Sequence, residues 1–334
     1  MSTKRIVLFI GYLLILMTTR SFAQFPEDAL RLSLSGLSVG ARALAMGGAY
    51  TGIANDFTAV YWNPAGLAQI RYYEISGGIG HLGYKNQSTF FGQSSSLSNN
   101  STSLSSAGFV YPLPTRRGSL TLAFGYNRSA DFTTALAFNG FNAVSSIIPS
   151  LYDPDENQDL AWQLYLEDST GYTPIQQNVG QRGSVLENDG VKNWTIAGAL
   201  EIIPKLYLGA TLTLISGSYS YTRNFIEEDA KRLYTKPPFD FQQLVVDNAI
   251  DWELSGYGFK IGMLYNIRDR ARFGITVKAP SRYTVKEKFQ TDGTSVFKTP
   301  DKKGIYQYTA SLSGRSEYDV QTPFVFGGGI SLNA

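Results

Sequence analysis

The stretch GARALAMGGAYTGIANDFTAVYWNPAGLA, Gly40–Ala68, decides the fold of this chain. It is rich in Gly and Ala, carries few charges and ends in a Trp-Asn-Pro-Ala-Gly run. Side chains this small offer little apolar area for an independent core, so we expect the segment to pack inside a larger structure. Alternating strands follow it from Tyr72 onward. The combination predicts a plug inside a β-barrel.

The N-terminal sequence predicts a signal peptide over residues 1–23. Lys4 and Arg5 precede the apolar run Ile6–Met17, and a small-x-small pattern ends at Ala23. A retained anchor is the alternative, but about a dozen apolar residues are too few to span a bilayer core. Beyond this leader we find no apolar run near the length of a spanning helix.

Composition excludes several classes of protein. The 334 residues contain no Cys and carry a net charge of +2, which removes disulfides, thiolate metal sites and Cys nucleophiles. No basic stripe suggests nucleic acid. Tyr, Phe and Gly number 21, 20 and 33. This composition suits barrel strands, with aromatic residues at the two membrane interfaces.

Period-2 alternation recurs along the chain and indicates strands with one apolar face. In one of them, Leu120, Leu122 and Phe124 share a face opposed by Thr121 and Ala123. The clearest strands are 119–127, 206–214, 256–265 and 272–279, and the weaker ones are 72–82, 104–113, 193–203 and 323–332.

The connections alternate between long and short. Long ones fall at 83–103, 128–192, 217–251 and 290–316, and short ones at 114–117, 204–205 and 267–271. Outer-membrane barrels show this asymmetry because their periplasmic turns are short and their external loops are long, whereas a soluble sandwich has no reason for it. We therefore predict an all-β, transmembrane, antiparallel outer-membrane β-barrel over 71–334, preceded by a hatch of short helices over 24–70.

About eight strands are complete by Leu332. An eight-stranded barrel fills its interior with its own side chains, so it cannot also hold the segment 25–68. Either that segment lies outside the barrel, or further strands follow Ala334. The chain lacks the terminal aromatic residue that is common in outer-membrane barrels. This favours the second interpretation, a C-terminally truncated sequence.

The motif Asn63-Pro64-Ala65-Gly66 has a mechanical interpretation. Asn63 precedes proline and is held extended, so its side-chain oxygen is placed to cap the turn that Pro64 opens. Gly66 permits a close approach to a neighbouring wall or an abrupt exit of the chain, and the Gly47-Gly48 pair interrupts the helical spacing upstream. The predicted hatch and gating residues are Gly47, Gly48, Asn63, Pro64, Ala65 and Gly66.

These residues carry a resemblance to a known family. The run Gly40–Ala68 resembles the N-terminal hatch of the FadL/OmpP1/TodX outer-membrane transporters, and Asn63-Pro64-Ala65 matches their hatch motif. Weaker similarity lies at 273–278, 281–289 and 322–329. The resemblance extends from Phe25 to the end of the chain, loosely through the loops.

The resemblance implies a barrel of about fourteen strands in the outer membrane of a Gram-negative bacterium. It implies passive uptake of long-chain fatty acids or other hydrophobic small molecules, by capture at the outer loops, passage through a lumenal pocket and lateral exit gated by the hatch. The implied partners are the ligand, outer-membrane lipid and the barrel-assembly machinery, with no cofactor. The oligomeric state stays open.

Two groups of side chains are candidates for ligand contact. Lys260, Arg272 and Lys278 occupy the non-lipid faces of their strands, where they would meet a carboxylate or take part in lumenal charge networks. Trp162, Tyr165 and Leu166 follow a helix cap at Asp159, and form either an outer docking surface or a lid that packs on neighbouring loops. These and the hatch residues are the candidate sites.

Three alternatives complete the sequence analysis. Shuttle proteins resembling PorV of the type IX secretion system share the hatch pattern, and a secretion partner that binds proteins through its outer loops is the runner-up. An enzyme is not expected, since His81 is the sole histidine and has no recognisable catalytic partners. The acidic run 153–159 lacks the glycine and the terminal Glu of a calcium loop, so we expect no metal site, although weak external Ca²⁺ binding stays open.

Overall fold

The structure, a computed structural model, describes residues 26–33, 39–237, 239–267 and 270–332. The chain divides into two compact units, Met1–Leu34 and Ser35–Ala334. The described part of the first unit is the helix α2 (Pro26–Ser33), in which Arg31 and Asp28 approach to 3.5 Å. The predicted signal peptide, residues 1–23, lies outside the described residues.

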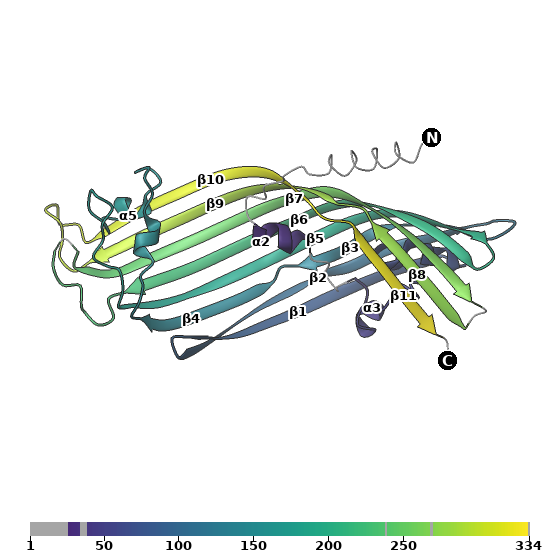
Figure 1. Cartoon of the computed structure of the whole chain (residues 1–334), viewed down its shortest axis with the longest axis horizontal. Helices are drawn as coiled ribbons and strands as arrows, with labels where there is room; N and C mark the ends of the chain where they lie inside the picture. The colour runs from purple at the N-terminus through teal and green to yellow at the C-terminus, as the bar shows by residue number, and fades with distance from the viewer. Residues whose placement is uncertain (1–25, 34–38, 238, 268–269, 333–334) are drawn as a thin grey trace, which may run out of the picture. The chain divides into compact units, whose positions relative to one another are not determined.

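The second unit is a curled antiparallel sheet (Figure 1). Within the described residues it has eleven strands: β1 (Glu74–Phe90), β2 (Gln93–Leu113), β3 (Leu120–Asp131), β4 (Thr134–Asn142), β5 (Val179–Ile203), β6 (Leu206–Glu228), β7 (Phe241–Ile267), β8 (Ala271–Lys278), β9 (Arg282–Phe297), β10 (Gln307–Gln321) and β11 (Val325–Leu332). The all-β, antiparallel prediction is confirmed.

These eleven strands make eight crossings of the sheet, because three crossings are each interrupted once. β3 and β4 both pair with β5, and β8 and β9 both pair with β7. β10 and β11 in turn pair with β9 and β8. The prediction of about eight strands is therefore confirmed for the described residues. The total of fourteen stays an expectation from the resemblance.

Two of the interruptions coincide with prolines. Pro280 separates β8 from β9 and Pro323 separates β10 from β11, as expected for a residue that cannot donate to a ladder. The breaks lie side by side. The Ser281 N–H donates to Thr322 Oγ1 at 2.9 Å, and the Thr322 N–H donates to the Ser281 carbonyl at 3.0 Å. The sheet therefore bends here with these backbone N–H groups satisfied.

The predicted long loops are wrong in extent, because much of each segment is strand. β1 and β2 occupy nearly all of 83–103 and meet at the turn Phe91-Gly92, whose φ values are 45° and 79°. Such values belong to the tight turns that suit hairpin twist. The other three connections shrink from 128–192, 217–251 and 290–316 to 143–178, 229–240 and 298–306.

Sequence patterns miss these strand halves because their outward faces are largely polar, although Leu244, Val246 and Trp252 are buried on the inward face of β7. Residues 93–103 of β2 are almost all Ser, Asn, Thr and Gln. Backbone ladders hold such segments instead. The pairing of β6 with β7, for example, continues without a break from Leu206↔Tyr265 to Glu228↔Gln243. A pattern search for alternating apolar residues detects only the lower part of such a strand.

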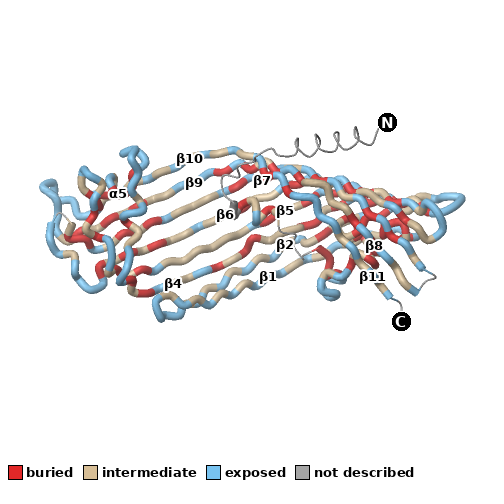
Figure 2. The backbone as a smooth tube through the Cα atoms, viewed as in Figure 1, coloured by how far each residue is buried: buried red, intermediate tan, exposed pale blue. Residues whose placement is uncertain are grey.

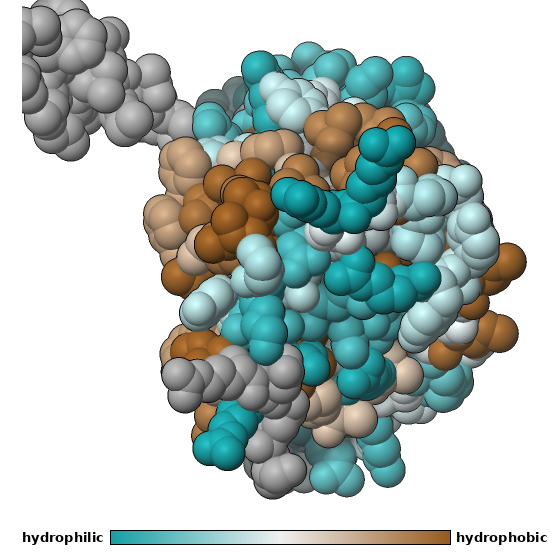
Figure 3. All heavy atoms as spheres, turned by 90° about the vertical axis from the view of Figure 1, so that its right-hand side faces the viewer, coloured by the Kyte–Doolittle hydropathy of each residue, from teal (hydrophilic) through white to brown (hydrophobic). Residues whose placement is uncertain are grey.

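The outward face is apolar only toward the end of the sheet that carries the short turns. On β6, the exposed Leu208, Leu212 and Leu214 give way to Ser216 and Ser218 further along. Viewed from the short-turn end, hydrophobic side chains lie along the flanks of the molecule and hydrophilic ones fill the middle (Figure 3). Other exposed members of this apolar band are Trp194, Ile196, Leu200, Tyr257, Phe259, Ile261, Phe273 and Ile275. The band covers about ten residues of each strand, the length of a transmembrane β-strand.

Aromatic side chains mark both limits of the apolar band. At the upper limit, Trp194 stacks on Phe124 at 6.0 Å and meets Tyr126 edge-on at 5.5 Å between ring centroids. At the lower limit, Tyr73 and Tyr111 lie 5.1 Å apart. Belts of this kind are typical of the two interfaces of a membrane barrel.

The concave face carries two buried clusters, one toward each end of the sheet (Figure 2). The short-turn end holds α3 (Ala41–Ala45), α4 (Ala59–Trp62) and the 3₁₀ helix η1 (Pro64–Gln69). The opposite end holds η2 (Ile148–Leu151) and α5 (Leu160–Gln163). In the described part of the chain, every helix is too short or too polar to cross a bilayer.

Candidate functional site

The segment 39–70, which we call the hatch, packs on inward-facing residues of the sheet. Its core combines small side chains with the fully buried Tyr50, Phe57 and Leu67. Ala43, Ala54, Ala59, Ala65 and Ala68 are all buried, together with the inward-facing Ala123, Ala197, Tyr207 and Leu264 of the strands. Residues of the strands complete this core, so the segment packs inside a larger structure, as its composition predicts.

Asn63 both caps η1 and binds the wall. Its Oδ1 accepts from the Ala65 N–H at 3.2 Å, so the predicted cap is confirmed. Its Nδ2 donates to the Thr51 carbonyl at 2.9 Å and to the Met263 carbonyl of β7 at 3.1 Å. The side chain is fully buried, and these three bonds use its acceptor and both of its donors.

Two glycines of the wall make room for this motif. A Cβ on Gly262 of β7 would overlap Asn63 Oδ1, and a Cβ on Gly209 of β6 would overlap the backbone of Pro64 and Ala65. The hatch motif therefore lies directly against the strand backbone. Only glycine permits so close an approach.

The remaining predicted hatch residues act within the hatch itself. Gly47 and Gly48 have φ values of 62° and 81°, and their N–H groups donate to Leu44 and Ala43 carbonyls, which ends α3. Gly66 approaches the Ala54 carbonyl, where a Cβ would overlap it. Gly66 was predicted to permit either a close approach to a neighbouring wall or an abrupt exit of the chain. The close neighbour is instead another hatch residue.

Lys260 connects β7 to the hatch. It points inward, donates to the Tyr61 carbonyl and lies 4.9 Å from the centroid of the Tyr61 ring. Its ladder partner on β8 is Lys278. The structure therefore brings two of the three predicted cations together beside the hatch. Arg272 lies apart from them at the start of β8, and the described residues give neither Lys278 nor Arg272 a hydrogen-bonded or ionic partner.

A row of aromatic side chains crosses the middle of the concave face. Phe132 lies in the break between β3 and β4 and meets Tyr219 of β6 edge-on, with 5.6 Å between ring centroids. The ring centroids of Tyr219 and Trp252 of β7 are 4.4 Å apart. All three are buried. Glu187 accepts from the Tyr219 hydroxyl at 2.7 Å, and Glu287 accepts from Trp252 Nε1 at 2.8 Å. Sequence analysis missed this row, since alternation gives the faces but not the strand register.

The outer end is closed by a second cluster, which we call the lid, comprising residues 143–178 with the strand residues they cover. Asp159 Oδ1 accepts from the Trp162 N–H at 2.9 Å, which confirms the predicted helix cap, and α5 ends at Gln163. Leu166 is fully buried among Leu160, Phe241 and Leu244. Of the three predicted docking residues, Leu166 therefore belongs to the lid core.

The other two predicted docking residues remain accessible. Trp162 is 39% exposed and Tyr165 61% exposed. The ring centroids of Tyr165 and Tyr308 of β10 are 4.2 Å apart, and this contact holds Tyr165 over the sheet. The lid thus packs on the inner face of the outer strands and keeps an aromatic surface outside.

Two carboxyl groups of the lid region have raised pKa values. Burial, a hydrogen bond with Asp159 and the charges of Asp159 and Asp168 raise the pKa of Glu167 to about 7. Burial also raises the pKa of Glu227, against the opposing effect of hydrogen bonds from Ser146, Gln181 and the Ile147 N–H. Both groups lie outside the apolar band.

The predicted acidic run and the histidine have ordinary local partners. Asp153 and Asp155 accept from the backbone N–H groups of Asp155 and Asn157, at 2.9 and 3.0 Å. His81 Nδ1 lies 2.8 Å from Thr102 Oγ1 on β2. Across the ranges that the structure describes, three or more metal-ligating side chains nowhere converge.

The wall separates between β2 and β3. Their ladder runs only from Leu113↔Leu120 to Ser106↔Asn127. Beyond it, β3 has an irregularity between Arg128 and Ala130 and ends at Asp131. Side chains of the β1–β2 hairpin then contact β4: Ser88 donates to the Ala137 carbonyl, and Asn99 to the Thr134 carbonyl at 3.1 Å. A continuous ladder is replaced here by isolated side-chain bonds.

Buried polar groups line the inner side of this separation. Asn193 donates to Asn127 Oδ1 at 3.1 Å. Asn127 Nδ2 and Asn193 Oδ1 have no hydrogen-bond partner among the described residues, and both side chains are buried.

A search of curated proteins finds no match. The family model for the outer membrane protein transport protein family (OMPP1/FadL/TodX) matches residues 28–323, most of the chain. That range includes the hatch, the aromatic row, the lid and the separated strands. The chain therefore belongs to the OMPP1/FadL/TodX family, non-enzymatic β-barrels that transport hydrophobic compounds across the outer membrane of Gram-negative bacteria.

Proposed function

We propose that this chain takes up long-chain fatty acids, or similar amphipathic small molecules, by passive diffusion gated by the hatch. The observation that carries the proposal is the pair of inward lysines, Lys260 and Lys278, beside the hatch and below an aromatic row. An apolar molecule with one anionic end matches this arrangement of charge and aromatic surface.

Capture begins at the lid in this proposal. Trp162 and Tyr165 present aromatic surface at its outside, while Leu166 anchors the same loop in the lid core. Aromatic side chains with an apolar body and a polar edge suit the first contact with an amphipathic molecule. The acyl chain then passes along Phe132, Tyr219 and Trp252.

The carboxylate end is received by the lysine pair. Directly opposed residues of an antiparallel ladder have Cβ atoms about 5 Å apart, so Lys260 and Lys278 hold like charges close together. An anion between them relieves that repulsion. It also competes with the Tyr61 carbonyl for Lys260, which loosens one contact between hatch and wall. Ligand arrival and hatch release are coupled in this way.

Exit occurs sideways, between β2 and the β3–β4 break. Each CH₂ group gains roughly 0.8 kcal/mol on leaving water for an apolar environment, so release of a long acyl chain into the aqueous periplasm is unfavourable. The exit lies at the lower end of the separation, beside Asn127 and Asn193, where the wall reaches the upper limit of the apolar band. No energy source is needed for such a path.

The test is uptake of a fluorescent fatty acid by liposomes that contain the protein. We expect uptake above that of empty vesicles, and reduced uptake in the Lys278→Gln variant. Lys85→Gln, on the exposed β1–β2 hairpin, is the matched control. A fatty alcohol of the same chain length should be insensitive to Lys278→Gln. Equal uptake by empty and protein-containing vesicles would end the proposal.

One observation favours a second function, that of a PorV-like partner of a secretion system. The outer connections expose large apolar side chains, among them Tyr152, Tyr172, Leu233, Ile305 and Tyr306. Exposed apolar side chains rimmed by polar residues mark protein interaction sites. Pull-down of secreted proteins by the protein in nanodiscs, lost when Leu233 and Tyr306 are changed to Ser, would favour this function over uptake.

A further inference from the structure

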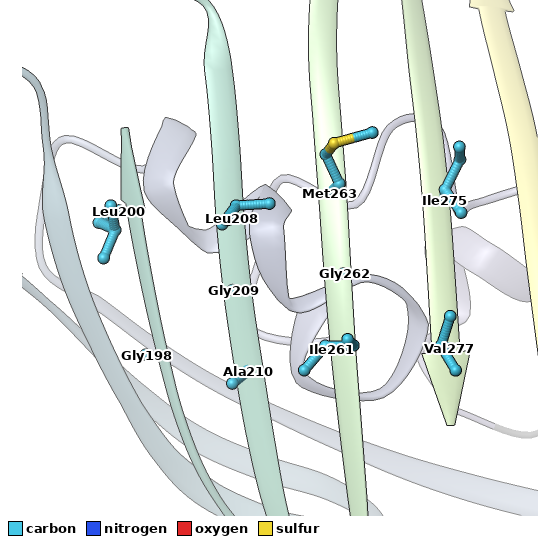
Figure 4. Close-up of a pocket in the computed structure, with 10 residues that line it drawn as sticks. All are labelled: Gly198, Leu200, Leu208, Gly209, Ala210, Ile261, Gly262, Met263, Ile275 and Val277. Carbon is cyan, nitrogen blue, oxygen red and sulfur yellow. The ribbon is translucent and has the colours of Figure 1, made fainter. Parts of the chain in front are cut away.

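Pairs of inward-facing glycines in the wall receive parts of the hatch. One pair, Gly209 and Gly262, receives the Asn63-Pro64 motif, and the hatch passes behind these two glycines in Figure 4. The outward face of this part of the wall carries an apolar groove, which we call the outer groove, lined in part by Gly198, Leu208, Ala210 and Met263. Another pair of glycines lies in β2 and β3, the strands that separate.

This second pair, Gly108 of β2 and Gly125 of β3, receives the ring of Phe57. The two glycines are direct partners in the ladder. A Cβ on Gly108 would overlap the Phe57 ring, and so would a Cβ on Gly125. Phe57 itself is fully buried. One aromatic ring of the hatch therefore lies across both strands, and only glycine at these two positions leaves room for it.

The ring lies at the lower end of the separation between the two strands. The ladder of β2 with β3 ends at Ser106↔Asn127, two residues beyond Gly108↔Gly125. Side chains of a strand alternate between its faces, so Gly108 and Ser106 are successive inward positions. The neighbouring outward residues Phe124 and Tyr126 contact Trp194 at the upper limit of the apolar band. Phe57 thus meets the wall at the depth of the proposed exit.

The backbone of Phe57 is tied to the wall on one side and to α4 on the other. Its N–H donates to Glu74 Oε1 of β1 at 2.9 Å. Its carbonyl accepts from the Val60 N–H at 3.2 Å, in the turn that leads into α4. The carbonyl of Tyr61 in α4 accepts from Lys260. About one helical turn therefore connects the Lys260 contact to Phe57.

We propose that Phe57 closes the lateral exit from inside, and that the ligand carboxylate withdraws it by drawing Lys260 away from the Tyr61 carbonyl. This inference rests on the proposed function, to which the lysine pair and the lateral exit belong. While the ring lies across Gly108 and Gly125, it holds β2 and β3 together at the end of their ladder. Movement of α4 withdraws the ring, and the acyl chain then meets bare glycine backbone at the edge of the apolar band.

Uptake of a fluorescent fatty acid by liposomes tests the closure. In Gly108→Ala the three heavy atoms nearest to the new Cβ all belong to the Phe57 ring, so this variant acts on Phe57 alone. We expect uptake about tenfold faster in Gly108→Ala and in Phe57→Ala, which corresponds to a barrier lower by about 1.4 kcal/mol. Phe57→Leu, with a shorter side chain, should be intermediate. Far-UV circular dichroism confirms that each variant is folded.

The double variant Gly108→Ala/Phe57→Ala should behave as Phe57→Ala, because the new methyl group enters the space that the ring has left. Effects that add would show two separate causes and overturn the proposal. Gly77→Ala, whose Cβ meets nothing within 4 Å, should behave as the parent. So should Leu67→Ala, which empties a fully buried site in η1. Faster uptake in Leu67→Ala would show general loosening of the hatch and overturn the role of Phe57.

Hydrogen exchange in nanodiscs without ligand separates this inference from the proposed function. We expect the backbone amides of 106–110 and 123–127 to exchange faster in Phe57→Ala than in the parent or in Leu67→Ala. Fatty acid should accelerate the same amides in the parent and not in Lys278→Gln. Absence of uptake by the parent, with faster exchange in Phe57→Ala, would end the proposed function and leave the closure by Phe57 supported. Unchanged exchange in folded Phe57→Ala would overturn that closure, whatever the uptake.

Discussion

The Asn63 side chain donates to the Met263 carbonyl, 200 residues further along the chain, at 3.1 Å. Met263 lies near the end of the wall strand β7, and Gly262 leaves room for the Asn63 side chain to reach its carbonyl. The same Asn63 caps η1. One side chain therefore fixes both the local structure of the hatch and its position in the barrel.

Loss of this side chain should detach the hatch from the wall. Asn63→Ala removes a cap and two hydrogen bonds at a buried site, each worth about 1 kcal/mol. We expect higher ion conductance of the protein in planar bilayers and faster proteolysis within residues 39–70. Asn100→Ala, on the exposed β1–β2 hairpin, is the control. Unchanged conductance and proteolysis would contradict the role of Asn63.

A methyl group on the wall should have a similar effect. In Gly262→Ala the new Cβ overlaps Asn63 Oδ1, and relief of such overlap typically costs about 1–3 kcal/mol. The hatch, rather than the strand, should move, because ladders hold β7 on both sides. Gly77→Ala in β1 meets nothing within 4 Å and is the matched control. Thermal unfolding followed by circular dichroism and bilayer conductance check the two variants.

The fluorescence of Trp252 should change when a ligand binds in the lumen. It is buried on the concave face beside Tyr219, whereas Trp194 is on the outward face. If the ligand passes along the aromatic row, fatty acid should change the tryptophan fluorescence of the protein, and Trp252→Phe should remove most of that change. Trp194→Phe should leave it in place. A ligand response that survives Trp252→Phe would exclude this path.

The fold was predictable where each strand has one apolar and one polar face. Leu208, Leu212 and Leu214 alternate with inward residues, and this alternation gives the strand and its lipid-facing side. The outer halves of the same strands were not predictable, since Ser218, Ser220 and Thr222 carry no apolar periodicity. Their strand character depends on ladders with residues far away in the chain.

The hatch motif was predictable and most of the inner surface was not. The cap of Asn63 follows from four adjacent residues, so local sequence is sufficient for it. The contact of Tyr219 with Phe132 and Trp252 depends on three strands in one register, and the Lys260–Lys278 pair depends on two. The outer groove has the same origin, because Gly198 and Ala210 become neighbours only through the pairing of β5 with β6.

The lid should respond to pH through Glu167. Its pKa is raised to about 7 by burial and by Asp159, while a Glu in the unfolded chain titrates near 4.3. The folded lid therefore holds the proton more tightly than the unfolded chain. The contribution of Glu167 to the stability of the fold is complete below about pH 4.3, and it is lost as the pH rises through about 7.

Glu167→Gln should remove this dependence, because the amide keeps a donor for Asp159 and stays neutral at every pH. Fluorescence of Trp162, whose N–H Asp159 caps, is the measurement, in a background with the other three tryptophans changed to Phe. We expect a transition near pH 7 in the parent and none in Glu167→Gln. Glu156→Gln, in the exposed acidic run, should behave as the parent. A transition that persists in Glu167→Gln would assign the response to another group, such as Glu227, whose pKa is also raised by burial.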